Sequence, residues 1–184
     1  MEKALIEAIL NKKKSAFSIF YNEIVDHFYS FLKSSYNLSN EEINDIIADT
    51  FVKIWIKLDS FDHNKWDFIT WTWTILRNTT KDYFKSKKDL TFSEFSINTE
   101  KNSTFEDLLE DETDILEELE KDYQIENIKK ALSQLKTDEK EIIFLRFSEW
   151  KPLEEVAQIM WISYSNVRVK LHRTIKKLQK YLSQ

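Results

Sequence analysis

The sequence predicts an all-α protein with two small helical domains joined by an acidic linker, the second being a helix-turn-helix domain. Three observations support this fold class. Apolar residues recur at spacings of three and four along most of the 184-residue chain, as on the inner face of an α-helix. A helix-turn-helix pattern lies near the C-terminus, and a strongly acidic segment precedes that half. We therefore expect domains at residues 1–92 and 124–184 and a linker at 93–123.

The first domain is predicted to be entirely helical. Apolar spacing indicates a short helix from residue 3 and an aromatic-rich core helix over residues 17–36. A third helix is expected after Ser39, a good N-cap that can form a capping box with Glu42. A polar loop over residues 59–65 then leads into a fourth helix from residue 67 to about 88.

The linker is defined by its charge. Residues 100–126 hold 12 Asp or Glu but only Lys101 and Lys121 as basic residues. Repulsion between like charges favours an extended linker. Two further helices, over residues 128–135 and 138–147, are expected to complete the core beneath the helix-turn-helix.

The helix-turn-helix begins near Pro152, which suits the first helical position. Ile162 is predicted to be a buried turn residue, and Ser163 the N-cap of the second helix. The apolar inner face of that second helix consists of Val167, Leu171, Ile175, Leu178 and Leu182.

The outer face of the second helix is basic. Residues 163–181 contain six Lys or Arg and no carboxylate, in a chain with a net charge of -5. A basic run alone is as well explained by a solvated surface. Combined with a helix-turn-helix, it favours binding to nucleic acid.

A second basic patch occupies the end of the predicted fourth helix. Arg77, Lys81, Lys85 and two further lysines face only one carboxylate, and aromatic residues lie between them. Single-stranded nucleic acid is held by this combination, because cations bind the phosphates and aromatic rings stack on unpaired bases. The ordinary alternative is a surface loop beside a solvated helix end.

Composition excludes several other classes. The chain has no Cys and three His, none with a partner at metal-ligand spacing, so we expect no metal site and no cofactor. An enzyme would have to use the carboxylates between Glu41 and Asp49 as a metal site, with no second cluster to assist them. No apolar run is long enough to insert into a membrane, and the first residues lack the features of a signal peptide, so a cytoplasmic protein is expected.

Four blocks in order resemble the extracytoplasmic-function sigma factors, the small two-domain sigma subunits of bacterial RNA polymerase. The blocks are DIIADTFVKIW at 45–55, FITWTWTILRN at 68–78 followed by Asp82 and Tyr83, ALSQL at 131–135, and the helix-turn-helix. The resemblance covers nearly the whole chain from about Phe17. It implies a subunit without catalytic activity that directs core RNA polymerase to promoter DNA and assists promoter opening. An anti-sigma factor is a further partner that the family leads us to expect.

The resemblance also implies three sets of site residues. Exposed residues of the third helix would contact polymerase: Asp45, Asp49, Lys53 and Trp55. The loop before the fourth helix would hold an unstacked base through Asp62, His63, Asn64 and Lys65. The fourth helix would hold the separated strand through Arg77, Asn78, Thr80 and Lys81. The helix-turn-helix would read the upstream element as duplex. Base contacts would come from Tyr164, Ser165, Asn166, Arg168 and Lys170, and phosphate contacts from Arg173, Lys176 and Lys177.

A stand-alone transcriptional regulator is the alternative function. Its C-terminal domain would bind duplex DNA, and its N-terminal helices would sense a ligand or form a dimer. Dependence of promoter binding on core polymerase distinguishes the two. Because an isolated C-terminal domain of roughly 60 residues would be marginally stable, we expect contacts between the domains to keep the free protein compact.

Glycine is absent, although average usage predicts roughly a dozen in such a chain. At Trp66, Trp150 and Trp161 the chain has Trp where the family usually has Gly. An indole is a poor substitute where positive φ is needed. We hypothesise that the gene comes from a genome that reads the codon UGA as glycine, and ordinary UGG codons at these positions would refute this.

Overall fold

The computed structural model describes residues 2–91 and 126–182, and the predicted linker at 93–123 lies outside these ranges. The first part contains α1 (Lys3–Leu10), α2 (Lys14–Ser35), α3 (Asn40–Lys57), a short 3-10 turn η1 (Leu58–Ser60) and α4 (Phe68–Thr91). The second contains a helical stretch at 126–133, α6 (Thr137–Ile143), a π-helical turn η2 (Phe144–Ser148), α7 (Leu153–Met160) and α8 (Tyr164–Leu182). No strand occurs within the described ranges, so the all-α prediction is confirmed.

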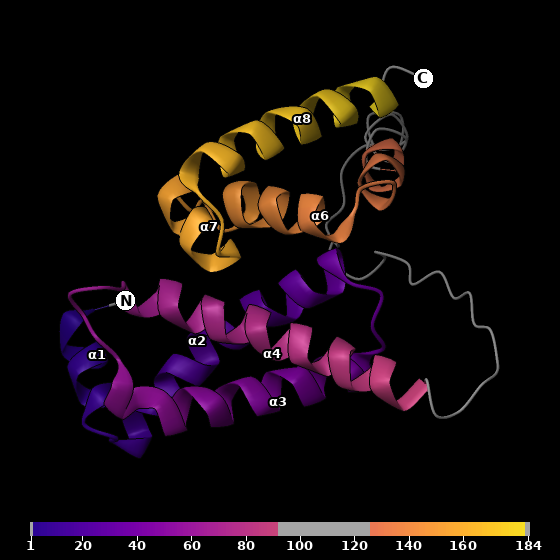
Figure 1. Ribbon diagram of the computed structural model, residues 1–184. Coiled ribbons are helices and arrows are strands. Elements are labelled where there is room, and N and C mark those ends of the chain that lie inside the picture. The colour runs from indigo at the N-terminus through magenta and orange to yellow at the C-terminus, as the bar shows by residue number, and fades with distance from the viewer. Residues whose placement is uncertain (1, 92–125, 183–184) are drawn as a thin grey trace, which may run out of the picture.

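Aromatic side chains fill the core of the first domain, where α2, α3 and α4 pack together (Figure 1). Trp73 of α4 is fully buried, and its ring lies 5.0 Å from the ring of Phe28 and 5.3 Å from that of Phe31, edge to face in both cases. Such edge-to-face pairs add stability beyond the burial of apolar area. Burial of Trp73 therefore places one face of α4 in the core and leaves only its other faces for further contacts.

The predicted start of α3 is confirmed. The Ser39 amide donates to Glu42 Oε2 at 2.8 Å, and the Glu42 amide donates to Ser39 Oγ at 3.2 Å. This capping box satisfies two backbone donors at the helix terminus. α4 begins at Phe68, one residue later than predicted, and Asp67 Oδ1 accepts a hydrogen bond from the amide of Thr70.

The helix-turn-helix is also present, with small corrections. Pro152 is the N-cap of α7, with extended backbone, rather than its first helical residue. Ser163 caps α8 as predicted, because its Oγ accepts from the Asn166 amide at 3.2 Å. Ile162 is half-buried rather than buried, and Leu182, predicted to lie on the inner face, is exposed because α8 extends beyond the packed part of the domain.

Backbone φ is positive at Lys12, Trp150 and Trp161 within the described ranges. At Trp161 the amide donates to Gln158 O and the next amide donates to Ala157 O, which is the hydrogen-bond pattern of a Schellman helix end. Gly is preferred there because it has no Cβ. The structure thus supports a Gly-like position at Trp150 and Trp161 but not at Trp66. Lys12 shows that a non-glycine residue can also adopt this conformation.

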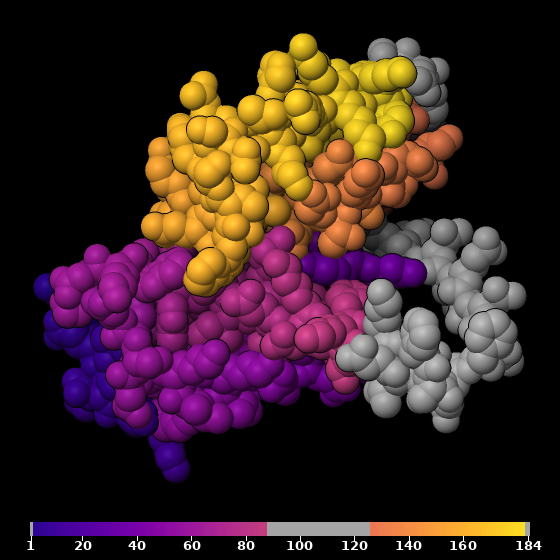
Figure 2. All heavy atoms as spheres, in the orientation of Figure 1, coloured from indigo at the N-terminus to yellow at the C-terminus, as the bar shows by residue number. Residues whose placement is uncertain are grey.

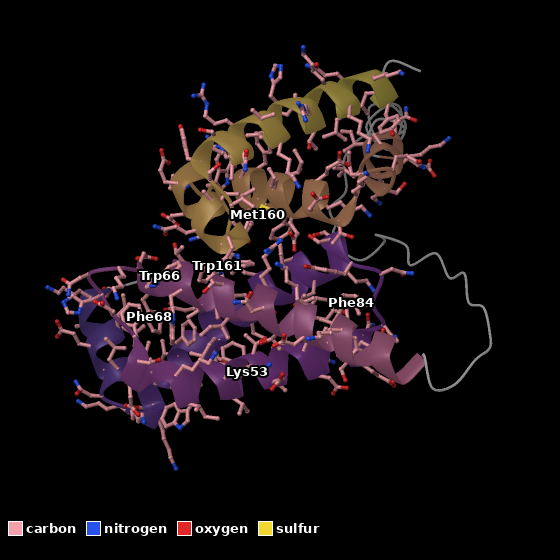
Figure 3. All side chains as sticks on the ribbon, in the orientation of Figure 1. Lys53, Trp66, Phe68, Phe84, Met160 and Trp161 are labelled. Carbon is pink, nitrogen blue, oxygen red and sulfur yellow. The ribbon has the colours of Figure 1, made fainter. Side chains whose placement is uncertain are left out.

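The two domains pack against each other through one apolar core. Figure 1 shows α6 and α7 seated on α2 and α4, and Figure 2 shows the two parts in close contact. The rings of Phe31 and Phe144 lie 5.5 Å apart across the boundary, and those of Trp66 and Trp161 lie 6.0 Å apart (Figure 3). The expected contact between the domains is confirmed.

Candidate nucleic-acid and polymerase interfaces

The first turns of α8 present the residues predicted to contact bases. Tyr164, Ser165, Asn166 and Arg168 are all exposed. The Arg168 guanidinium lies 5.9 Å from the centroid of the Tyr164 ring, a cation–π distance that helps to order both side chains. Since α6 and α7 lie between α8 and the first domain, this surface faces solvent (Figure 1).

Two of the predicted basic contacts turn toward α6. Lys170 pairs with Asp138, and Lys177 Nζ lies 2.8 Å from Glu139 Oε2. The hydrogen bond that Lys177 donates to the Glu139 carboxylate raises the pKa of Lys177. Arg173 and Lys176 stay exposed beside them. The sequence missed these pairs because their members lie 32 and 38 residues apart.

A groove of about 560 Å³ runs along α8, with Leu153 of α7 at one side. Arg168 and Arg173 lie at this groove, together with Val169 and His172, which the sequence analysis did not assign to the site. Basic side chains beside an apolar groove suit a surface that meets phosphates and base edges.

The loop before α4 is ordered by Asp62. Its Oδ1 accepts a hydrogen bond from the Asn64 amide at 2.9 Å, and Lys65 Nζ lies 3.6 Å from Oδ2. The backbone hydrogen bond from Asn64 is the main cause that lowers the pKa of Asp62. His63, Asn64 and Lys65 are exposed, so three of the four predicted loop residues are accessible.

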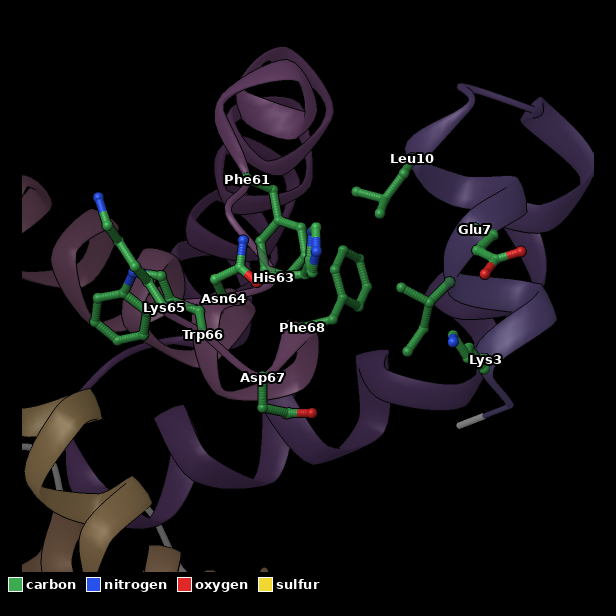
Figure 4. Close-up of a pocket in the computed structure, with 11 residues that line it drawn as sticks. Lys3, Glu7, Leu10, Phe61, His63, Asn64, Lys65, Trp66, Asp67 and Phe68 are labelled. Carbon is green, nitrogen blue, oxygen red and sulfur yellow. The ribbon is translucent and has the colours of Figure 1, made fainter.

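This loop forms one wall of a pocket of about 680 Å³, and α1 forms the opposite wall (Figure 4). Phe61 and Trp66 contribute aromatic surface, with Phe68 buried beneath them, and Ile6 and Leu10 contribute apolar surface from α1. The sequence analysis predicted the loop wall but missed α1. Local sequence patterns cannot show that two segments more than fifty residues apart lie together. The contribution of α1 to the pocket is therefore seen only in the packed structure.

The four predicted strand contacts on α4 do not share one accessible surface. Asn78 and Lys81 are exposed, whereas Arg77 and Thr80 are buried. The Thr80 hydroxyl donates to Leu76 O within its own helix at 2.9 Å. Partial burial, followed by the nearby charge of Arg77, lowers the pKa of Lys81. In this arrangement α4 offers two of the four side chains to a ligand.

The predicted polymerase contacts lie on α3. Asp45 and Asp49 are exposed, while Lys53 is half-buried and pairs with Asp49 at 2.9 Å. Trp55 packs against Phe17 with ring centroids 4.9 Å apart, so part of its surface belongs to the core.

Two exposed apolar side chains on α3 were missed by the sequence analysis. Val52 is 55% exposed and Ile56 66% exposed. They lie one helical turn apart beside Lys53 and contribute apolar area that no other described residue covers. Their signal in the sequence was weak because apolar residues occur on both faces of this helix.

Within residues 2–91 and 126–182, no group of three His, Asp or Glu side chains is arranged to hold a metal ion. In the same ranges, no helix is both long enough and apolar enough to span a membrane.

Two family matches cover more than half of the chain. Residues 20–89 match Sigma-70 region 2, and residues 131–180 match Sigma-70, region 4. The first includes α3 and nearly all of α4, and the second includes α7 and nearly all of α8, the two helices of the helix-turn-helix. The order of the two matches is that of the two domains in the structure.

Relatives and solved structures agree with these matches. The chain is 27% identical to RNA polymerase sigma factor YlaC of Bacillus subtilis over 90% of its length and 88% of the relative. It is 26% identical to ECF RNA polymerase sigma factor SigW of the same organism, over 77% and 75%. The fold is similar to that of sigma factor RpoE of Bartonella quintana, solved with the anti-sigma factor NepR (TM-score 0.65, 21% identity, 91% and 96% covered), and to CnrH, solved with the cytosolic domain of CnrY (TM-score 0.67, 20% identity, 98% and 96% covered).

Both domains of the sigma-70 family are therefore present in their expected order, with the helices that the four sequence blocks predicted. The chain belongs to the sigma-70 family and is an RNA polymerase sigma factor of the extracytoplasmic-function type.

Proposed function

We propose that this sigma factor recognises promoters through two separate surfaces, one in each domain. The exposed first turns of α8 bind the upstream element as duplex, with Arg168 at base edges and Arg173 and Lys176 at phosphates. The single observation that carries this assignment is the exposure of Arg168, Arg173 and Lys176 on α8. Lys170 and Lys177 contribute less, because carboxylates of α6 already hold them.

The pocket between α1 and the loop before α4 receives an unstacked base of the downstream element. Taking a base out of its stack costs a few kcal/mol, which an aromatic-lined pocket with nearby polar groups can offset. Phe61 and Trp66, which are half-buried, supply aromatic surface, and His63 and Asn64 supply hydrogen-bonding groups at its rim. α4 then holds the separated strand through Asn78, Lys81 and, once accessible, Arg77.

The outer face of α3 docks on core polymerase. Asp45, Asp49 and Lys53 supply charges, and Val52 and Ile56 supply the apolar surface that a protein interface needs. In this assignment, residues 1–92 and 124–184 act as two binding domains, and residues 93–123 as the linker between them. No catalytic step is assigned to either domain, and the protein works in the cytoplasm beside polymerase and DNA.

An anti-sigma factor is a proposed third partner. RpoE and CnrH, whose folds are similar, were each solved with a second protein, which in the case of RpoE is an anti-sigma factor. A partner of this kind would reduce transcription in proportion to its amount in a reconstituted assay, and adding excess sigma factor would restore it.

Run-off transcription with bacterial core polymerase tests the proposal on a library of promoter fragments. Discrete start sites are expected only when both proteins are present, and Arg168→Ala and Lys81→Ala should each weaken them. Lys14→Ala is the matched control, because it removes one exposed cation outside the proposed surfaces. If the protein alone bound duplex tightly and core polymerase gained no start sites, the stand-alone regulator would replace this proposal.

A further inference from the structure

The C-terminal domain covers one face of α4 with carboxylates. Thr70 Oγ1 donates to Glu155 Oε2 of α7 at 2.7 Å, and Arg77, two turns further along α4, reaches Glu141 of α6. These residues are 85 and 64 positions apart in sequence. Of the side chains that the proposed function assigns to the promoter strand, Arg77 is therefore held by the protein itself, while Asn78 and Lys81 stay exposed.

The pair formed by Arg77 and Glu141 is buried and joined by three hydrogen-bond contacts. Arg77 Nε lies 3.1 and 3.0 Å from the two carboxylate oxygens of Glu141, and Nη2 lies 3.0 Å from Oε2. The side chains of Arg77 and Glu141 are only 8% and 2% exposed. A guanidinium that meets two oxygens in this way binds a phosphate with the same geometry.

Neighbouring groups complete the site from both domains. The Tyr36 hydroxyl of the first domain donates to Glu141 Oε1, and burial raises the pKa of this tyrosine, so it stays a donor. Arg77 Nη1 donates to Met160 O at 3.1 Å. That carbonyl is at the C-terminal end of α7, where backbone acceptors lack helical partners and the helix dipole is negative. Arg77 thus binds two elements of the C-terminal domain at once.

We propose that the C-terminal domain is an intramolecular competitor of the promoter strand, with the Glu141 carboxylate in the place of a phosphate on Arg77. This rests on the proposed role of α4 in holding that strand. Arg77 cannot bind Glu141 and DNA together, so strand binding requires the domains to separate. Free sigma factor is closed on this face, and the open form is the one that holds melted DNA.

The pair is suited to such a switch because its members belong to different domains. When the domains part, water solvates both charges, which offsets much of what the pair gains when buried. Removing the charge of Glu141 alone leaves the Arg77 cation buried without a counter-charge in the closed form, although Met160 O still accepts a hydrogen bond from it. The closed form is then disfavoured, while each domain keeps its own helices.

The first measurement is the distance between the domains in the full-length protein. The chain has no Cys, so Asn22→Cys on α2 and Gln179→Cys on α8, both exposed, give two specific labelling positions for fluorescence energy transfer. Glu141→Gln should shift the population toward the long distance. Glu139→Gln is the matched control, because Glu139 lies on the same helix but pairs with Lys177 inside its own domain.

The second measurement is binding of a fluorescent single-stranded oligonucleotide to each unlabelled protein. If only the open form binds, the apparent affinity scales with the open fraction, and Glu141→Gln should tighten binding by about tenfold or more. Glu154→Gln, which removes an exposed charge of α7 away from Arg77 and Lys177, should leave it unchanged. A distance that does not change in Glu141→Gln overturns the proposal, as does opening without tighter strand binding.

A separate experiment tests the proposed role of α4 in holding the promoter strand. Core polymerase with wild-type protein on a promoter fragment carrying a premelted bubble reports strand binding once the domains have separated. If Arg77→Ala has no effect there, α4 does not hold the strand and the proposed function fails at this point. If Arg77→Ala weakens that complex but Glu141→Gln does not open the free protein, only the competition is refuted.

Discussion

Two basic helices with similar sequence signals differ in their surroundings. α8 lies on the side of its domain away from the first domain, and Arg168, Arg173 and Lys176 are open to solvent. α4 lies against α7, and its Arg77 is buried. The sequence predicts a nucleic-acid-binding surface on both helices. The difference teaches that access, rather than charge, separates the duplex-binding surface from the strand-binding surface in the free protein.

The largest effect is expected from Arg77→Ala. This change leaves Glu141 without its cation, and breaking a buried pair from one side costs about 3–5 kcal/mol. Opening of the domains relieves that cost, so urea denaturation should change from one joint transition to two. Lys81→Ala, one turn further along α4, is the control because its side chain is exposed. A single transition with an unchanged midpoint would show that the pair does not hold the domains together.

Arg168→Ala should weaken promoter binding by roughly 5- to 150-fold, equivalent to about 1–3 kcal/mol, and relax preference at one base pair. Lys170→Ala should have a smaller effect, since Asp138 already holds its ammonium. Gel shifts of the polymerase complex on duplex promoter variants measure both. Equal losses would mean that exposure on α8 does not decide which side chains contact DNA.

Trp150→Gly should stabilise the C-terminal domain by about 1 kcal/mol, because an L-residue with a Cβ is disfavoured at its φ of 52°. Trp161→Gly should gain less, since it also removes the contact with Trp66 across the boundary. Trp66→Gly removes the same contact, and no backbone stabilisation is expected because φ is not positive at Trp66. Thermal unfolding measures all three, and a loss of stability in Trp150→Gly would contradict the backbone argument. Sequencing the gene tests the UGA hypothesis directly.

The smallest effect concerns the far end of α4, which is tied to α3 of its own domain. Hydrogen bonds from Lys87 and Tyr83 lower the pKa of Glu42 to about 2. A lowered folded-state pKa stabilises the domain above the unfolded value near 4.5, and this is lost as pH falls toward 2.

Because the cluster around Glu42 is partly open to solvent, the gain should stay below about 1 kcal/mol. Glu42→Gln should therefore flatten the fall in stability between pH 5 and 2, measured by urea denaturation. The distance between the domains should not change in this variant. If it does, the two ends of α4 are coupled and the comparison with α8 needs revision.

Local signals predicted most of the helices. The capping box at Ser39 and the N-cap at Ser163 are interactions over three residues, so the sequence contains both partners. The apolar spacing likewise identified α2, α3 and α8, because one face of each must be buried. The helix-turn-helix and its basic face could therefore be predicted, with errors of a residue or so at Pro152 and Phe68.

Contacts between distant segments could not be predicted in the same way. Burial of Arg77 and Thr80, pairing of Lys170 with Asp138, and the wall that α1 adds to the pocket all depend on how helices pack. The sequence by itself determined the helices, their caps and the two concentrations of positive charge, because these follow from neighbours within a few residues. Only the tertiary structure decided which charges face solvent, since a long side chain on a helix can reach water or a partner from another element with equal local cost.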